Sequence, residues 1–251
     1  MKYSVLTYIF GENYERVREI INKQEDVDYV LVTDNRMLQS ATWNVIYWEG
    51  SPDMNSFDKV CYVRYHPFEF VHTNTVIKID GSMQVTNGDL STMITEFEKY
   101  DLALVPHPSR TSCAEEYAAW IQYRGYPSMM AEFAYKMLCN MGLDPEYKSL
   151  FQLGFSIERN DNLTKSINEV TYSLVKFMDN GHCHRIDQII YSFVINKFFN
   201  YINILPLEEH NFLDGKYLQV YYHNTDQPLV SISPNPRQQY VLNKLVTPVL
   251  F

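Results

Sequence analysis

Residues Tyr29–Thr33 form the unbroken run YVLVT, in which three of the five side chains are β-branched. A strand with one face in water alternates apolar and polar residues, whereas this run predicts a strand that is covered on both faces. Such strands occur in parallel sheets that carry helices on their two sides. The run ends in the turn pair Asp34-Asn35. This stretch therefore points to an α/β fold.

Further apolar stretches of strand length surround this run, and longer connections separate them. The segment Asn13–Lys23 carries apolar residues at helical spacing, which predicts a helix between the first two strands. Strands joined by helices or long connections imply βαβ crossovers, and hence a Rossmann-type α/β/α sandwich with a mostly parallel central sheet. The other predicted strands are Tyr3–Ile9, Val45–Trp48, Val76–Ile79 and Leu102–Val105.

The second half of the chain is more helical. Ser112 and Glu115 have the spacing of a capping box and predict a helix that runs to Tyr123. Because no linker is visible, residues 1–251 are expected to form a single domain, with 232–251 as a tail packed on it. The remaining predicted elements are helices Ser128–Met141 (closed by Gly142), Lys165–Met178 and Asp187–Asn200, and late strands at Asn203–Leu205 and Leu218–Tyr222.

Charge and cysteine content narrow the class of protein. The net charge of −9 argues against a protein that coats nucleic acid or an anionic membrane. The four cysteines show no C-x-x-C pairing, so a zinc ribbon or a redox motif is not indicated, and free thiols favour a reducing compartment. No apolar run reaches the length of a transmembrane helix. We expect a cytoplasmic protein without a transmembrane segment.

Polar residues lie near the ends of three of the predicted strands. In open α/β sheets, ligands bind at the carboxyl ends of the strands, which selects Thr7-Tyr8, Asp34 and Asp80-Gly81-Ser82. An aspartate at a strand tip, followed by glycine, suits a divalent cation that bridges a diphosphate. Asp-Gly is also a common turn dipeptide, so Asp80 has an ordinary alternative role as a turn residue.

Short motifs follow one another in a definite order along the chain. They are Phe10-Gly11, Thr33-Asp34, Ile79-Asp80-Gly81, His107-Pro108-Ser109-Arg110 with Glu116 downstream, Gly154…Arg159, and Arg185-Ile186-Asp187-Gln188. This ordered set resembles a glycosyltransferase-like family with a GT-A fold, found in bacteria and plants and long catalogued as a domain of unknown function. The resemblance spans roughly residues 3–200, and its strength is the order of the motifs, because each one alone is weak.

The chain is more distantly similar to retaining transferases of the glycogenin type. That similarity implies a metal site at Asp80 and His223, and catalytic roles for Asp187 and Gln188. The expected cation is Mn²⁺ or Mg²⁺. One position departs from the pattern, because Ser82 stands where those enzymes have the second carboxylate of Asp-x-Asp. Serine is a weaker and neutral ligand, so we expect either a low metal affinity or an arginine or lysine that supplies the charge of the cation.

The chemistry of sugar transfer suggests a role for each residue. Negative charge develops on the leaving diphosphate, and a cation or an arginine must stabilise it. Asp187 and Gln188 are expected to hold sugar hydroxyls or to stabilise the anomeric centre. The expected donor contacts are Tyr8 stacking on the base, Asp34 on the uracil or ribose, and His107 and Arg110 on the sugar or diphosphate, with Thr7, Ser82, Glu116, Arg159 and Arg185 beside them.

Several of these residues have simpler explanations. Asp187 is also favoured at a helix start by the helix dipole. Glu115 is explained as the capping-box partner of Ser112, which leaves Glu116 as the one to face a ligand. His107 can bridge backbone groups, and His223 can be a satisfied core residue. The cluster His182-Cys183-His184 invites a zinc interpretation, but no second ligand pair lies at zinc spacing, so a solvated loop is favoured.

The leading hypothesis is a bacterial glycosyltransferase of polysaccharide assembly. It would move a hexose, from UDP by preference and with retention of configuration, to a glycan or lipid-linked glycan acceptor. The alternative is a non-catalytic nucleotide-sugar or glycan-binding module in which Ser82 marks a lost metal site. A nucleotidyltransferase is disfavoured, because the acidic, glycine-poor segment Phe10–Asn13 stands where such enzymes have a glycine-rich basic loop.

Overall fold

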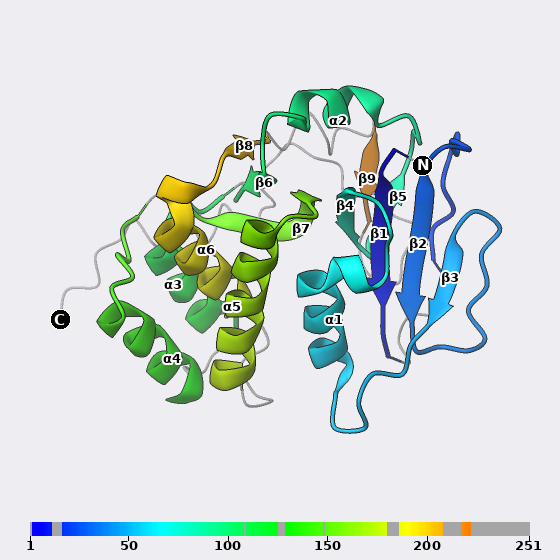
Figure 1. The fold of residues 1–251 in the computed structure, drawn as a ribbon. Coiled ribbons are helices and arrows are strands. Elements are labelled where there is room, and N and C mark those ends of the chain that lie inside the picture. The colour runs from blue at the N-terminus through cyan, green and yellow to red at the C-terminus, as the bar shows by residue number, and fades with distance from the viewer. Residues whose placement is uncertain are drawn as a thin grey trace.

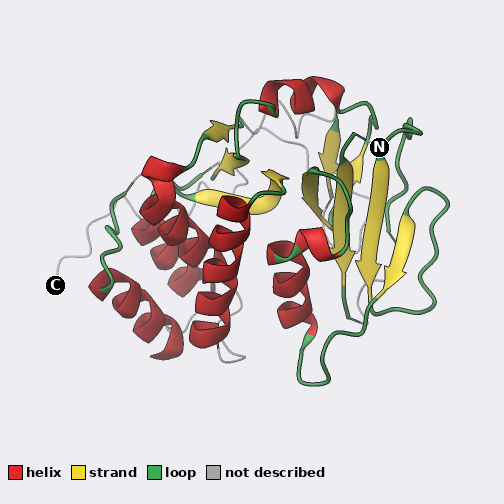
Figure 2. Cartoon of the chain, viewed as in Figure 1, coloured by secondary structure: helices red, strands yellow, loops and turns green. Residues whose placement is uncertain are grey.

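The structure of the protein is a computed structural model (Figure 1). The structure describes residues 2–11, 17–107, 109–124, 129–147, 149–179, 186–207 and 217–221, without the side chains of 120, 123, 124 and 130. A seven-stranded sheet crosses the molecule. The helices that follow residue 112 gather beside the strands Leu102–Pro106, Phe151–Arg159 and Ile204–Pro206, at one end of this sheet (Figure 2). The predicted α/β sandwich with a mostly parallel sheet and a more helical second half is confirmed.

The strand order of the main sheet is β3-β2-β1-β4-β7-β6-β8. Only β7 is antiparallel to its neighbours in this sheet, so the other strands all run the same way. The strands are β1 (Ser4–Ile9), β2 (Asp28–Thr33), β3 (Asn44–Tyr47), β4 (Thr75–Asp80), β6 (Leu102–Pro106), β7 (Phe151–Arg159) and β8 (Ile204–Pro206); β5 (Met83–Val85) and β9 (Leu218–Val220) pair separately.

The reversed strand β7 determines what meets at the functional edge. Its first residues, Phe151 and Gln152, pair with Pro106 and Val105 at the carboxyl end of β6. On its other side, Phe155 pairs with Ile79, next to the carboxyl end of β4. The amino end of β7 therefore lies at the same edge as the carboxyl ends of the parallel strands, where ligands are expected.

Helices cover the sheet on the side that carries the site. α1 and α5 contact each other, and α6 packs between α5 and strand β7. Because the strands are buried on both faces, their side chains divide between separate apolar clusters on the two sides of the sheet. The helices are α1 (Ser56–Tyr65), α2 (Ser91–Phe97), α3 (Cys113–Arg124), α4 (Met129–Asn140), α5 (Asn162–Asp179) and α6 (Asp187–Phe198), with 3₁₀ turns at Pro67–Glu69 and Phe199–Tyr201.

The predicted helix Asn13–Lys23 is wrong over its described part, because residues 17–23 are irregular. Their backbone groups bond to distant segments instead of to one another. Ile20 N donates to Thr42 Oγ1 at 2.9 Å, and Ile21 N donates to Val85 O at 3.0 Å. Val17 and Ile20 are still buried, so the apolar pattern of this segment reflects the burial of its side chains and not a helical backbone.

Four helices and strands were not predicted, namely α1, α2, β5 and β7. The tail 232–251 lies outside the described residues, and the single-domain assignment of 1–251 stays a prediction. Among the described residues, the helices are too short or too polar to cross a bilayer.

Candidate functional site

A cavity of about 500 Å³ opens at the carboxyl edge of the sheet. It brings together three predicted motifs that lie far apart in the sequence: the tip of β4, the segment after β6 and the start of α6. The polar side chains that line it are Tyr8, Arg64, Asp80, His107, Arg110, Glu116, Gln152, Asp187 and Gln188, and its apolar lining includes Ile9, Phe10, Phe57, Val60 and Leu153.

Asp80 is both a turn residue and a cavity residue. Its Oδ1 accepts a hydrogen bond from Ser82 N at 3.0 Å, which is the geometry of an Asx turn. Glycine at 81 is required by space: a Cβ there would lie 2.8 Å from Ile9 Cγ1 and 3.1 Å from Tyr8 O. The Asp-Gly pair therefore lets the tip of β4 lie against the end of β1 while the carboxylate faces the cavity.

His107, Arg110 and Glu116 form one cluster after β6. His107 Nδ1 accepts hydrogen bonds from Ser109 N at 3.2 Å and from Arg110 N at 3.1 Å. Burial, and then the charge of Arg110, lower the pKa of His107 to about 3, so the imidazole is neutral. Arg110 Nε forms a short ion pair with Glu116 Oε2. The histidine thus orders the turn, and the glutamate holds the guanidinium at the cavity.

Asp187 lies at the first position of α6 and is 7% exposed. Its Oδ2 is 2.7 Å from Arg64 Nη1, and Arg64 Nε donates to Tyr8 Oη at 2.9 Å. Burial works to lower the pKa of Arg64, but its neighbours Tyr8 and Asp187 outweigh that effect and raise it well above its usual value. Burial also raises the pKa of Tyr8 to about 12. At neutral pH the cavity floor therefore holds an ion pair beside a neutral phenol.

Two amide side chains of the cavity are left with unused donors. Gln152 Nε2 and Gln188 Nε2 are buried and have no hydrogen-bond partner among the described residues. A buried polar group without a partner is costly, and such groups in native structures call for a ligand, a water or a functional reason. Gln152 is on β7 and Gln188 is on α6, and these two elements contact each other.

Some predicted site residues lie away from this cavity. Asp34 accepts from Gly11 N at 3.1 Å and pairs with Lys59 Nζ at 2.7 Å, so its carboxylate ties the end of β2 to α1. Thr7 is 1% exposed within β1. The side chain of Ser82 does not line the cavity. Tyr8 does line it, but this residue is only 4% exposed, so little of its ring is accessible for stacking on a base.

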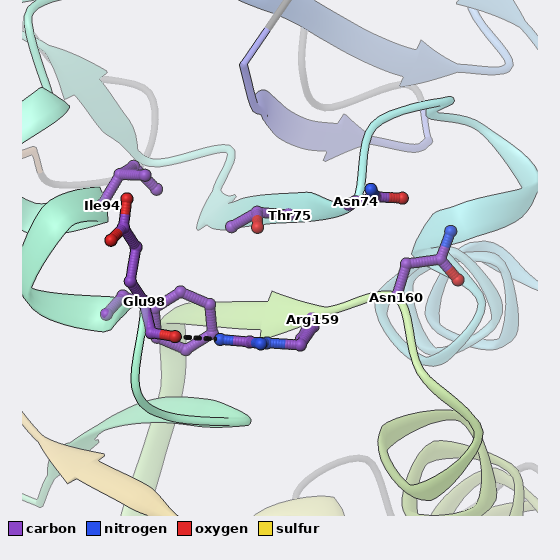
Figure 3. Close-up of a pocket in the computed structure, with 7 residues that line it drawn as sticks. Asn74, Thr75, Ile94, Glu98, Arg159 and Asn160 are labelled. Atoms are coloured by element: carbon purple, nitrogen blue, oxygen red, sulfur yellow. Dashed lines mark hydrogen bonds between the residues drawn. The ribbon is translucent and has the colours of Figure 1, made fainter.

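Arg159 lies at the opposite edge of the sheet. It lines a second cavity of about 400 Å³ together with Thr75, the first residue of β4, whereas Asp80 is the last (Figure 3). The six residues of β4 span roughly 17 Å from one of these sheet edges to the other. Arg159 Nη2 donates to Glu98 O at 2.5 Å, which joins β7 to the end of α2. The predicted Gly154…Arg159 element is thus divided, because only Gly154 lies at the first cavity.

Arg185, His223 and the cluster His182-Cys183-His184 lie outside the described residues. Within the described ranges, no three His, Cys, Asp or Glu side chains are grouped as a metal centre. The first cavity is nevertheless lined by three carboxylates and only two guanidinium groups. Glu116 and Asp187 are paired with arginines, which leaves Asp80 to face a cation. One carboxylate plus substrate phosphates is a usual ligand set for Mg²⁺, so the residues fit such an ion.

Arg64 and Gln152 are cavity residues that the sequence analysis did not single out. Arg64 is on the unpredicted helix α1, whose start carries a capping box of Asn55 and Asp58. Gln152 is on the unpredicted strand β7, where apolar residues alternate from Phe151 to Ile157. Both signals are visible in the sequence and could have located these elements.

The solved structures that the chain matches include two glycosyltransferases. The apo form of mouse xyloside xylosyltransferase 1 is 9% identical with a TM-score of 0.49, over 83% of this chain and 86% of that chain. The glycosyltransferase GlyE of Streptococcus pneumoniae is 13% identical with a TM-score of 0.49, over 98% of this chain and 61% of that chain. This chain therefore spans about three fifths of the GlyE structure. No protein-family model and no curated protein matches the chain.

Proposed function

We propose that this protein is a glycosyltransferase of the GT-A type that moves a hexose from a UDP-linked donor to a glycan or lipid-linked glycan acceptor. The observation that carries the proposal is the single cavity lined by Asp80, the His107–Arg110 cluster and Asp187-Gln188. Separate strand ends and a helix start contribute to it, as expected for a ligand site in an open α/β sheet.

The diphosphate of the donor would bind between Asp80 and Arg110. Asp80 would hold Mg²⁺ or Mn²⁺, which would neutralise the charge that develops on the leaving diphosphate. Arg110 would donate to phosphate oxygens, with Glu116 fixing its orientation. His107 would remain neutral and would order the turn, because its Nδ1 already accepts two backbone hydrogen bonds.

The sugar would lie against β7 and α6. The unused donors of Gln152 and Gln188 suit hydroxyl groups of a hexose. Asp187, which pairs with Arg64, would stabilise the oxocarbenium-like transition state. In the reaction, the bond from the anomeric carbon to the diphosphate breaks and UDP keeps its electron pair. The acceptor oxygen then bonds to that carbon on the face from which the diphosphate leaves and gives its proton to the departing diphosphate oxygen, so the configuration is retained.

A non-catalytic nucleotide-sugar-binding module is the second candidate. Two observations favour it: the carboxylate of Asp187 is committed to Arg64 at 2.7 Å, and the Ser82 side chain does not line the cavity. Both candidates predict donor binding, whereas only a transferase turns the donor over.

The testing experiment measures melting temperature with UDP and UDP-hexoses, with and without Mn²⁺ or Mg²⁺, and then donor hydrolysis. A ligand at one hundred times its Kd raises stability by about 2.7 kcal/mol, which is readily detected. We expect Asp80→Asn to abolish the cation-dependent part of the shift. The control Asp26→Asn removes an exposed carboxylate that pairs with Lys2 and should behave as wild type. No shift with UDP or with any UDP-hexose would overturn the proposal, and binding without hydrolysis would favour the binding module.

A further inference from the structure

Below the cavity floor, the sheet carries a buried ion pair that the proposed chemistry does not use. Lys78 is 4% exposed and Glu158 is fully buried, and their side chains are in direct contact. Lys78 is two residues before Asp80 on β4, so both side chains are on the same face of the sheet. Glu158 on β7 is opposite Val76, which makes it a diagonal neighbour of Lys78.

Lys78 also contacts the helix that carries Arg64. Its Nζ donates to Arg64 O at 2.7 Å. Arg64 is the last residue but one of α1, where backbone carbonyls have no partner within the helix. A cation at this end also complements the helix dipole. The lysine therefore satisfies a buried carbonyl and fixes the end of α1 on the sheet.

Glu158 is held from the other side by α5. Asn168 Nδ2 donates to its Oε2 at 2.9 Å. A continuous buried chain of contacts thus runs from Asn168 through Glu158 and Lys78 to Arg64, and from Arg64 to Asp187. It joins α5, β7, β4, α1 and α6 in one line under the cavity.

Stability alone is a weak explanation for this chain, because a buried ion pair can often be replaced by apolar side chains without loss. We propose that Lys78 and Glu158 are positioning residues. They hold the end of α1 in the position from which the guanidinium of Arg64 contacts both Tyr8 and Asp187. The effect of the pair on the position of Arg64 can be measured without a ligand. Its effect on turnover rests on the proposed function.

The test replaces the pair by apolar residues of similar length. The variant Lys78→Met/Glu158→Met/Asn168→Leu removes the ion pair and the amide that would lose its partner. The matched control Glu132→Met/Lys136→Met removes an ion pair on α4 whose side chains are 42% and 70% exposed. Both proteins are first compared with wild type by circular dichroism and thermal melting.

The main measurement is hydrogen exchange at the Nε–H of Arg64 in ¹⁵N–¹H spectra, assigned with the variant Arg64→Lys. In the wild type this hydrogen is donated to Tyr8 Oη in a buried site, so exchange should be slow. We expect at least tenfold faster exchange in the folded apolar variant and no change in the control. Unchanged exchange and chemical shift would overturn the inference, even if the melting temperature falls.

A second variant covers the case in which the apolar variant does not fold. Glu158→Gln keeps the shape and can still accept from Asn168 but lacks the charge that faces Lys78. It should speed exchange at Arg64 Nε–H at least threefold, and an unchanged rate would again overturn the inference. If wild type hydrolyses a UDP-hexose, kcat of the folded variant should fall about tenfold while KM stays within threefold. A wild type without hydrolysis counts against the proposed function and leaves the exchange result unaffected.

Discussion

Arg64 Nη1 and Asp187 Oδ2 lie 2.7 Å apart, although 123 residues separate them in the chain. The two residues come from α1 and α6 and meet over the sheet. Both side chains are about 10% exposed, so neither charge is solvated by bulk water. The carboxylate that the motif pattern marks for catalysis is therefore held by a residue that the pattern does not contain.

The first prediction concerns the stability that depends on this pair. Arg64→Met strands a buried carboxylate, and Asp187→Leu strands a buried guanidinium, so each should lower the free energy of unfolding by about 3–5 kcal/mol. The double variant should recover most of that loss, because no unpaired charge remains. Urea unfolding measures all three. The exposed pair Arg36–Glu49 is the control, and its removal should leave the free energy of unfolding close to that of wild type. Additive losses in the double variant would contradict the pairing.

The second prediction concerns the two glycines at the cavity. Gly81→Ala forces a Cβ to within 2.8 Å of Ile9 Cγ1 and 3.1 Å of backbone oxygen, so it should cost about 1–3 kcal/mol. Gly154→Ala meets only the end of the flexible Met83 side chain at 2.9 Å and should cost less than about 1 kcal/mol. Denaturant midpoints of the two variants decide the order. An equal cost would show that the tip of β4 can move.

The third prediction is a dependence of stability on pH. The pKa of His107 is about 3 in the folded protein, below the ordinary value of 6.5, because burial disfavours the charged form. Between these values the unfolded chain binds the extra proton, so stability contributed by His107 is complete above pH 6.5 and is lost as pH falls towards 3. The slope reaches about 1.4 kcal/mol per pH unit.

His107→Asn tests this assignment, because an amide oxygen can accept from the same backbone groups and does not titrate. Unfolding free energies at pH 7, 6 and 5 should fall less steeply for the variant than for wild type. Parallel curves would mean that the imidazole is more accessible to water than its 9% exposed side chain implies.

The fourth prediction separates two arginines that the motif pattern treats alike. Arg110→Met should weaken UDP binding about tenfold, which corresponds to about 1.4 kcal/mol. Arg159→Met should leave UDP affinity within twofold of wild type, because Arg159 lines the cavity at the opposite edge. The latter should lose about 1 kcal/mol of stability with its hydrogen bond to Glu98 O. Calorimetric titration measures both, and the reverse order of affinities would refute the site.

Sequence patterns located the strand ends well because burial and turn chemistry are local properties. The tips at Asp80 and Asp34 follow from apolar runs that end in polar residues. Local patterns could not show that Asp34 is used to bind Lys59, nor that Arg159 is at the far end of β7. Those facts depend on the strand order and on the reversal of β7, which no single segment encodes.

Helix α1 illustrates the opposite problem. Its sequence SFDKVCYVRY mixes β-branched and aromatic residues and shows no clear apolar stripe. Packing against the sheet and the capping box outweigh that weak propensity: Asn55 Oδ1 accepts from Phe57 N at 2.8 Å and from Asp58 N at 3.0 Å. Arg64 was missed together with the helix, because its importance comes from tertiary contacts.

The reversal of β7 has a topological consequence. Pro106 and Phe151 are paired neighbours in the sheet, so everything from 107 to 150, including α3 and α4, leaves and re-enters the sheet at one place beside the cavity. The excursion carries His107, Arg110 and Glu116, so one insertion between two paired strands supplies a wall of the cavity. The wall and the floor of the cavity are therefore separate in the sequence, because the floor residues Arg64 and Asp187 come from α1 and α6.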